Sequence, residues 1–120
     1  MENKEVTMGF SPFMAGDGSA WPPQAFTTDS GIYSLVGITN ANIAMHMQDT
    51  HNNMLLYICT GAWVIQGDGS AGKATFTPSP ADVSTGHLGK PGTYRIYPVV
   101  TLSTGVKPMD WQLMEVVAQP

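Results

Sequence analysis

The sequence predicts an all-β fold, and three observations support this class. Helical periodicity is nearly absent from the 120 residues. The chain carries 13 glycines and 9 prolines, which leave little room for helices of the usual ~11 residues. Short runs rich in β-branched and aromatic residues recur between turn signals. We therefore expect a sandwich of about seven to eight antiparallel strands with one short helical turn, in a single domain over residues 1–120 whose core spans about 6–117.

The longest predicted strand lies near the C-terminus, over residues 94–102. Gly92 permits a tight entry, and the run is rich in aromatic and β-branched residues. The segment Ser103-Thr104-Gly105 supplies a turn, because glycine adopts positive φ without strain. Residues 111–117 then return as the hairpin partner. Alternation alone leaves open which face of the long strand is buried, because both faces carry large apolar side chains.

Six earlier strands are predicted, at residues 6–13, 24–28, 42–48, 54–59, 62–66 and 73–77. The clearest alternation is in residues 42–48, where Ile43, Met45 and Met47 share the face that we expect to be buried. Residues 32–37 are expected to be an irregular link. Thr60-Gly61 divides two apolar runs and predicts a bulge or kink. Ser79 followed by Pro80 predicts a helical turn, with serine as N-cap and proline at the first helical position.

Composition argues against two classes of partner. The net charge is -4 and the five cations are scattered, so no basic cluster is present to neutralise nucleic-acid phosphates. The longest apolar run, residues 54–65, is broken at Thr60 and Gly61 and is shorter than the roughly 20 residues that span a bilayer. Charged residues make up only 12% of the chain, about half the usual share. Such weakly charged surfaces suit contacts with other protein chains.

The N-terminus and the single cysteine indicate where the protein is made. Residues 1–5 are charged and no apolar segment follows them, which is unlike a signal peptide. Cys59 is the only cysteine, so no disulfide can form within the chain. Its neighbours are apolar, which favours a buried structural thiol over a reactive one. We expect synthesis in a reducing cytoplasm, where the protein stays until it joins an assembly.

Two glycine-rich segments resemble ligand loops but are better interpreted as turns. Residues 67–73 approach a phosphate-binding P-loop, yet Ala74 stands where that motif needs Ser or Thr, and a strand follows instead of a helix. The sequence Gly-Asp-Gly-Ser-Ala occurs at Gly16 and again at Gly67. Each copy supplies one carboxylate, too few for a calcium loop. We expect two turns of similar chemistry.

No catalytic, cofactor-binding or metal-binding set can be assembled from the sequence. His46 and His51 lie five residues apart across a turn, His87 is distant, and no Cys or Asp/Glu cluster completes a zinc set. No serine is placed beside a histidine base. The sequence therefore predicts a protein that is not an enzyme and that uses no cofactor.

The order of several short motifs resembles a family, the immunoglobulin-like domain of tailed-phage structural proteins, as found at the N-terminus of phage upper baseplate proteins. The motifs that carry the resemblance are Ala15-Gly16-Asp17 with Trp21-Pro22-Pro23, Asp29-Ser30-Gly31, Leu35-Val36-Gly37-Ile38-Thr39, residues 42–47, Gly72-Lys73-Ala74-Thr75-Phe76, Ala81-Asp82-Val83, Pro91-Gly92-Thr93-Tyr94, Gly105 and Glu115-Val116-Val117. They span roughly residues 6–117. Val36 departs from the family, which often has Thr there, and residues 84–90 lengthen the link before Pro91.

The resemblance implies an immunoglobulin-like sandwich and a place in a virion. It also implies that Tyr94, Ile96 and Val100 form the buried face of the long strand. The expected function is that of a non-enzymatic adaptor in the baseplate or tail, or of a capsid decoration. Its expected partners are other phage structural proteins and further copies of the same chain. The longer link at 84–90 suggests a contact element that includes His87 and Leu88.

The residues themselves suggest further contacts. Trp21 beside Pro22 and Pro23 is the best candidate for an exposed anchor, and Tyr97 lies on the strand face opposite Tyr94. Edge strands of a small sandwich can also pair with a neighbouring chain. A carbohydrate-binding adhesion module remains an alternative, and it predicts exposed coplanar aromatics such as Trp21, Tyr33 and Tyr97 on one face. An enzyme is a third, disfavoured class.

Overall fold

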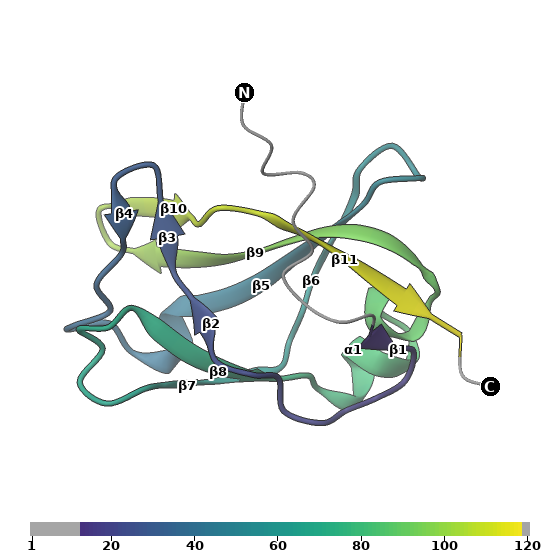
Figure 1. Ribbon diagram of the computed structural model, residues 1–120, viewed down its shortest axis with the longest axis horizontal. Helices are drawn as coiled ribbons and strands as arrows, with labels where there is room; N and C mark the ends of the chain where they lie inside the picture. The colour runs from purple at the N-terminus through teal and green to yellow at the C-terminus, as the bar shows by residue number, and fades with distance from the viewer. Residues whose placement is uncertain (1–12, 119–120) are drawn as a thin grey trace.

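β-Strands build nearly all of the regular structure. The computed structural model describes residues 13–118, and Figure 1 shows their arrangement. The described strands are β1 (Phe13–Met14), β2 (Gln24–Ala25), β3 (Thr27–Thr28), β4 (Gly31–Ile32), β5 (Ile43–Asp49), β6 (Leu55–Ile58), β7 (Ala62–Ile65), β8 (Lys73–Thr77), β9 (Gly92–Leu102), β10 (Gly105–Pro108) and β11 (Gln112–Val117). The described helices are α1 (Pro80–Ser84) and the 3₁₀ helices η2 (Asn40–Asn42) and η3 (His87–Gly89). The all-β class is therefore as predicted.

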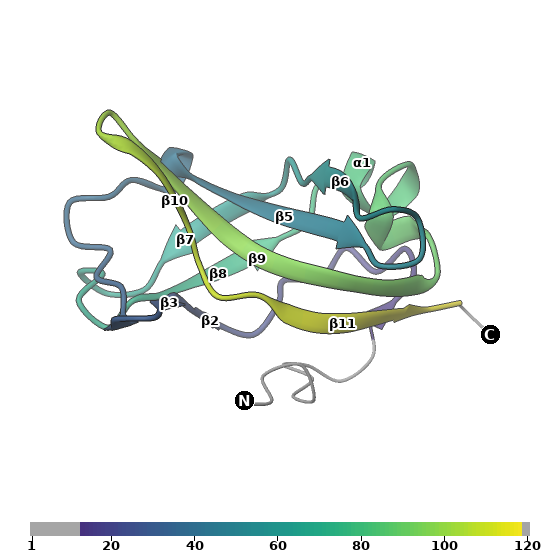
Figure 2. The same cartoon turned by 90° about the horizontal axis from the view of Figure 1, so that it is seen from above.

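Two sheets form the layers of the molecule. The large sheet has the order β1-β11-β9-β5-β6, with β10 also paired to β9, and the small sheet has the order β2-β8-β7. In Figure 1 the large sheet lies above the small one, and Figure 2 looks down on the large sheet. Strands β3 and β4 form a separate hairpin. The strands outnumber the seven to eight expected because several have only two residues, and one pair, β1 with β11, is parallel instead of antiparallel.

Most buried side chains of the long strands come from one face; Val99 on the opposite face of β9 is also buried. Ile43, Met45 and Met47 on β5 are at most 6% exposed, which confirms their predicted place in the core. Tyr94, Ile96 and Val100 on β9 are at most 2% exposed, so the face implied by the family resemblance is also confirmed. They belong to one hydrophobic cluster with Trp63 and Phe76 of the small sheet. This shared core joins the two layers.

The strand that returns after β9 is interrupted, unlike the single run predicted. Strand β10 forms a hairpin with β9 through the Gly105 turn, and β11 then pairs with an earlier part of β9. Between them the chain bends away. The Met109 N–H donates to the Pro98 carbonyl at 2.9 Å, and the Asp110 N–H donates to the Thr27 carbonyl at 2.8 Å. The first bond holds this link against β9, and the second attaches the β3–β4 hairpin to it.

The predicted helical turn is present. Ser79 is the N-cap of α1, its hydroxyl accepts from the Asp82 N–H at 3.2 Å, and Pro80 begins the helix. The predicted first strand lies outside the described residues except at Phe13. The predicted strand 24–28 is divided into β2 and β3 at Phe26, whose side chain is fully buried.

The two Gly-Asp-Gly-Ser-Ala segments are turns of the same kind. In each, the serine N–H donates to the preceding aspartate Oδ1 at 2.9 Å, Ser19 to Asp17 and Ser70 to Asp68. Hydrogen bonds from Ser19 and Ser70 hold the pKa of Asp17 and of Asp68 below the usual value. The second segment joins β7 to β8 as a hairpin, which is the predicted alternative to a phosphate loop.

Candidate functional site

Strand β6 concentrates exposed apolar side chains on one edge of the large sheet. Leu55, Leu56 and Ile58 are 53%, 43% and 48% exposed. The other exposed large hydrophobic residues that the structure describes lie singly on other elements, namely Met14, Ile32, Val36, Val64 and Val106. Scattered exposed apolar residues are ordinary, whereas a contiguous group marks an interaction surface. We call Leu55, Leu56 and Ile58 the β6 patch.

Strand β6 offers free backbone groups as well as apolar side chains. It pairs with β5 on one side, in a register that joins Met47 to Tyr57 and His46 to Ile58. The Cys59 N–H donates to the Met45 carbonyl at 2.9 Å, so Cys59, Tyr57 and Leu55 are the hydrogen-bonded positions of this antiparallel ladder. The N–H and C=O groups of Leu56 and Ile58 therefore point away from β5. No other described element contacts β6 to a comparable extent, and this edge is open.

The other described edges are protected. Strands β1 and β2 have only two residues each, and β10 carries Lys107 and Pro108; short strands, lysine and proline all discourage strand addition. On β7, the Ile65 N–H donates to Asn40 Oδ1 at 3.0 Å, so a side chain occupies that edge. Strand β6 has neither charge nor proline. It is the described edge best suited to receive another strand.

The outer face of the large sheet continues the patch. Because opposed residues in an antiparallel pair point to the same face, Ile58, His46 and Tyr97 form one row across β6, β5 and β9. The His46 and Tyr97 rings are 5.5 Å apart. Burial lowers the pKa of His46, so its ring is neutral at pH 7. This part of the outer face is therefore uncharged.

Arg95 is the cation of the outer face, and it is paired with an aromatic ring. It lies opposite Gln48 on β5 and Leu113 on β11. Its guanidinium carbon is 4.4 Å from the centre of the Trp111 ring, a cation–π distance. Both residues are half-buried. On β9, Arg95 lies two residues before Tyr97 on the same face, so the pair adjoins the uncharged row of His46 and Tyr97.

A buried polar cluster holds the inner side of β6. Asp82 is fully buried, and its carboxylate accepts from the Tyr57 hydroxyl at 2.9 Å, the Thr60 N–H at 2.8 Å and the Ser79 N–H at 2.8 Å. Burial and this carboxylate raise the pKa of Tyr57 to about 12. The cluster ties α1 to the end of β6. These hydrogen bonds hold the inner side of β6 in place, so the conformation of the strand is set before any partner binds.

Trp21 was expected to be exposed, and this prediction is wrong. It is 6% exposed, and its backbone N–H donates to the Phe76 carbonyl at 2.8 Å. Its ring packs edge-on against Phe76 at 5.0 Å and lies 5.7 Å from Phe13. The backbone bond anchors Trp21 beside β8 with its ring in the core, while Pro22 and Pro23 alone are exposed. Trp21 therefore cannot contribute to a carbohydrate-binding face with Tyr33 and Tyr97.

His87 and Leu88 were expected in an exposed contact loop, and the structure buries both. They are 6% and 0% exposed. The His87 ring lies 4.9 Å from that of Tyr94 and 5.4 Å from that of Tyr57, and its Nε2 is 3.1 Å from the Leu55 carbonyl oxygen. The lengthened segment 84–90 folds inward through η3 and closes one end of the core. His87 and Leu88 thus support β6 from inside, whereas Ser84, Thr85 and Lys90 of the same segment are exposed.

Tyr97 is the one predicted contact that lies beside the candidate surface. It is half-buried on the outer face of the large sheet, whereas Pro22 and Pro23 directly precede β2 of the small sheet. The predicted contact residues therefore do not gather at one place. Sequence reasoning missed Leu56 and Ile58. The available signal was that residues 54–58 are apolar without alternation, which means that both faces of a strand there are apolar.

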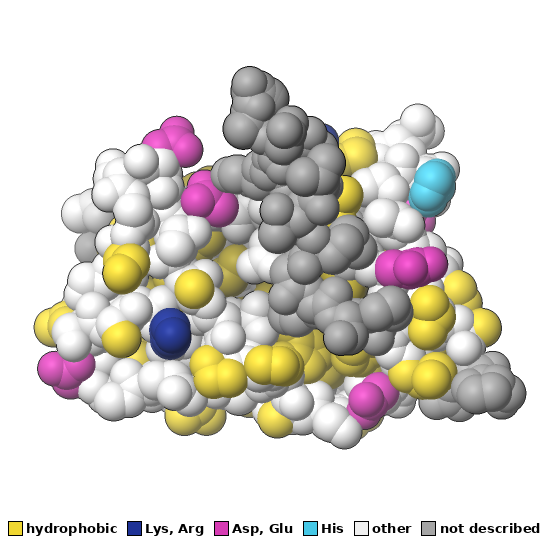
Figure 3. Space-filling view, in the orientation of Figure 1, with side chains coloured by type: hydrophobic (Ala, Val, Ile, Leu, Met, Phe, Trp, Pro, Cys, Tyr) yellow, Lys and Arg dark blue, Asp and Glu magenta, His cyan; other side chains and the backbone are white. Residues whose placement is uncertain are grey.

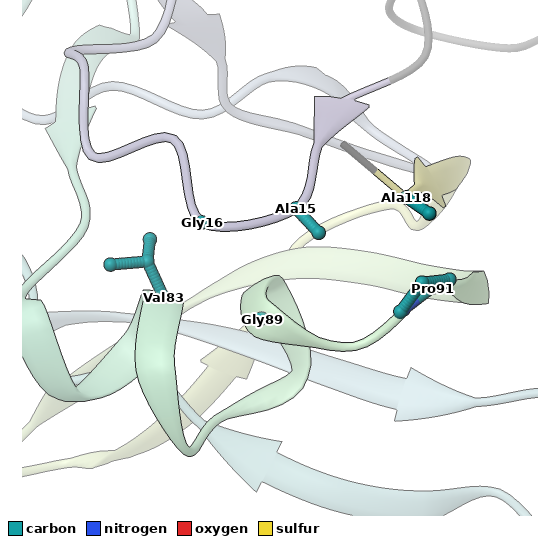
Figure 4. Close-up of a pocket in the computed structure, with 6 residues that line it drawn as sticks. All are labelled: Ala15, Gly16, Val83, Gly89, Pro91 and Ala118. Carbon is teal, nitrogen blue, oxygen red and sulfur yellow. The ribbon is translucent and has the colours of Figure 1, made fainter. Parts of the chain in front are cut away.

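A shallow hollow of about 320 Å³ opens beside α1 (Figure 4). It is lined by Ala15, Gly16, Val83, Gly89, Pro91 and Ala118. These residues present small apolar side chains and backbone but no titratable group. In the view of Figure 3, charged side chains are scattered among hydrophobic and other uncharged groups. The hollow offers no means for acid–base chemistry or charge recognition.

Within residues 13–118, no group of three or more His, Cys, Asp or Glu is placed to hold a metal ion. No helix in that same range has the length and apolar character to cross a membrane. Comparisons with protein-family models, with curated proteins and with solved structures found no match.

Proposed function

We propose that this chain is a non-enzymatic structural protein of a tailed-phage virion, a baseplate or tail adaptor or a capsid decoration, with an immunoglobulin-like sandwich as its fold. It acts through protein–protein contacts. The observation that carries the proposal is the β6 patch, where exposed apolar side chains and outward backbone groups coincide on an unprotected edge. The virion setting rests on the motif resemblance described above.

The chemistry of the β6 patch favours a protein partner. Backbone N–H and C=O groups on an edge strand are recognised by another extended chain, which adds to the sheet. Burying apolar surface contributes roughly 25 cal/mol per Å², and an uncharged surface costs little to desolvate. The neighbouring row of Tyr97 and His46 and the Arg95–Trp111 pair add aromatic groups, which are frequent at the centres of protein interfaces.

The motifs of the resemblance occupy structurally distinct places in this fold. The Gly-Asp turn at Gly16 precedes the small sheet, Gly72-Lys73-Ala74-Thr75-Phe76 runs into β8, and Pro91-Gly92-Thr93-Tyr94 begins the central strand β9. Turns and strand starts are positions where backbone geometry restricts the residue type. Motifs at such positions, in the order found in the family, are compatible with the same order of strands in this chain and in the family. This supports the proposed sandwich.

The test is binding to phage tail and capsid fractions, measured by co-sedimentation. We expect the wild-type chain to sediment with one fraction and the variant Ile58→Lys to lose at least about tenfold in affinity. The matched control is Val106→Lys, because Val106 is 61% exposed on β10 and lies outside the β6 patch. Failure of the wild type to bind either fraction, together with retention on a polysaccharide column, would instead favour the adhesion module.

A further inference from the structure

We infer that the open edge of β6 pairs with β6 of a second copy of this chain, in an antiparallel two-fold dimer that joins two large sheets. The inference rests on the proposed function in using the same surface, and it names the partner. A two-fold dimer is the commonest form of homo-oligomer, and it requires a self-complementary surface. The β6 patch meets this requirement in register, side-chain chemistry and charge.

The register is set by the free backbone groups. The outward N–H and C=O groups belong to Leu56 and Ile58, which flank Tyr57. A two-fold axis at Tyr57 places Leu56 of one copy opposite Ile58 of the other, so that both pairs exchange backbone hydrogen bonds. An axis at Leu56 or at Ile58 would pair one of these positions with itself and leave the other opposite residue 54 or 60. The Thr60 N–H already donates to Asp82, and Met54 has a left-handed backbone with a φ of 57°, so neither residue continues the ladder. The axis at Tyr57 is therefore the one that uses all four groups.

The same register gathers the apolar side chains. Opposed residues in an antiparallel pair share a face, so Leu56 and Ile58 of both copies form one continuous apolar row on the outer face. Each is close to half exposed in the single chain. Tyr57 of one copy faces Tyr57 of the other on the inner side, an aromatic cross-strand pair. Residues that are individually ordinary at a surface become a buried strip in the dimer.

The charge distribution permits this contact between two acidic chains. Each copy carries a net charge of -4, so self-association needs a surface where no carboxylates oppose. About the Tyr57 axis, the Asn53–Met54 end of one β6 lies beside Thr60 of the other, and these residues are uncharged. Asp82, close to the end of β6, is fully buried and saturated with hydrogen bonds. Within residues 53–60, the segment that lies along the axis, no charged side chains oppose each other.

The size of the contact predicts a weak dimer. The β6 patch has three half-exposed apolar side chains. The area that these can bury is smaller than the roughly 800 Å² per partner of a standard stable interface. We therefore expect association at roughly 100 μM, the range of weak, small interfaces. Such a contact forms readily when copies are held at high local concentration in a particle.

The first test measures the solution mass of the full chain by sedimentation equilibrium as its concentration rises. We expect the mass to rise from 12.8 kDa towards twice that value. Leu56→Lys and Ile58→Glu should each weaken association at least about tenfold, and the control Val106→Lys should leave it unchanged. Circular dichroism of each variant checks that it is folded.

A mixture of the two charged variants tests the register. Because position 56 opposes position 58 of the second copy, Leu56→Lys and Ile58→Glu chains should associate with each other more strongly than either does with itself, and added salt should weaken the mixed dimer. Failure of the mixture to recover association would overturn this register. A wild-type chain that stays monomeric into the millimolar range would overturn the dimer itself. Neither result bears on co-sedimentation with phage fractions, which tests the proposed function separately.

Discussion

At the residue scale, Asp82 holds the inner side of β6 through several hydrogen bonds. It is fully buried, and Tyr57, Thr60 and Ser79 all donate to it. In the variant Asp82→Ala these donors lose their acceptor, which we expect to lower the free energy of unfolding by about 2–4 kcal/mol. Urea denaturation measures this loss.

The control for this variant is Asp68→Ala. Asp68 accepts a hydrogen bond from a serine N–H, as Asp82 does, but it lies in an exposed turn, where water replaces a lost bond. Asp68→Ala should therefore lower the free energy of unfolding much less than Asp82→Ala does. Equal losses in the two variants would mean that the buried cluster contributes nothing beyond an ordinary turn.

Tyr57 gives the cluster a dependence on alkaline pH. Its pKa is raised to about 12 in the folded chain, by burial first and then by Asp82, whereas an unfolded tyrosine has a pKa of about 10. The folded state therefore holds the phenolic proton more tightly, so this contribution to stability is complete below pH 10 and is lost as the pH rises from about 10 to 12. Denaturation curves across this range should show stability falling.

The variant Tyr57→Phe isolates this effect. Burial also raises the pKa of Tyr94 and Tyr97, so part of the alkaline loss should persist. The decline should nevertheless be shallower in Tyr57→Phe than in the wild type. If the stability of the wild type and of Tyr57→Phe fell identically with pH, the pKa of Tyr57 would be the same in the folded and unfolded chains.

At the scale of elements, the chain changes sheets at Thr60 and Gly61, between β6 and β7. A Cβ atom on Gly61 would lie 2.2 Å from the Thr77 carbonyl oxygen and 2.8 Å from the Phe76 ring, so the backbone of β8 would have to move. We expect Gly61→Ala to destabilise the fold by roughly 3 kcal/mol. Thermal unfolding of the variant measures this effect.

Gly18→Ala is the matched control for this crossing point. A Cβ atom at Gly18 would have nothing within 4 Å, so its substitution should change stability by less than about 0.5 kcal/mol. A mild effect at Gly61 would mean that the crossing point between the sheets adapts easily, and that β6 is held less firmly than its contacts indicate.

Local patterns in the sequence predicted some elements well. The alternation of Ile43, Met45 and Met47 identified β5 and its buried face, and Ser79 with Pro80 identified α1, because each pattern acts over a few neighbouring residues. The outer contact residues were predicted less well. The prolines beside Trp21 restrict the backbone but do not decide which way the ring faces, and that is decided by Phe76, far along the chain.

The candidate site itself depends on strand order, which no local pattern encodes. Residues 54–58 are apolar on both faces, a composition typical of a central buried strand. They form an edge instead, because β9 occupies the other side of β5. Only this non-local pairing exposes Leu56 and Ile58, so the sequence predicted a strand there but not a surface.

At the scale of the whole molecule, stability and accessibility are distributed unequally across the large sheet. Strand β9 lies between β5 and β11, and β5 between β9 and β6, so the central strands are paired on both sides. Strand β6 is paired on one side. The same arrangement that pairs the central strands on both sides leaves one edge of the large sheet available.

Hydrogen exchange followed by NMR tests this distribution across the molecule. In dilute solution we expect the slowest exchange at amides of β5 and β9, and fast exchange at Leu56 and Ile58, whose N–H groups face outward. As the protein concentration rises, pairing of β6 with a second copy should slow exchange at these two amides, while Gly18 in its exposed turn should not change. Slow exchange at Leu56 in dilute solution would show that the chain already covers this edge. Fast exchange at every concentration would show that no strand adds there, and any contact with a partner would then be made through the outer face around Tyr97 and Trp111.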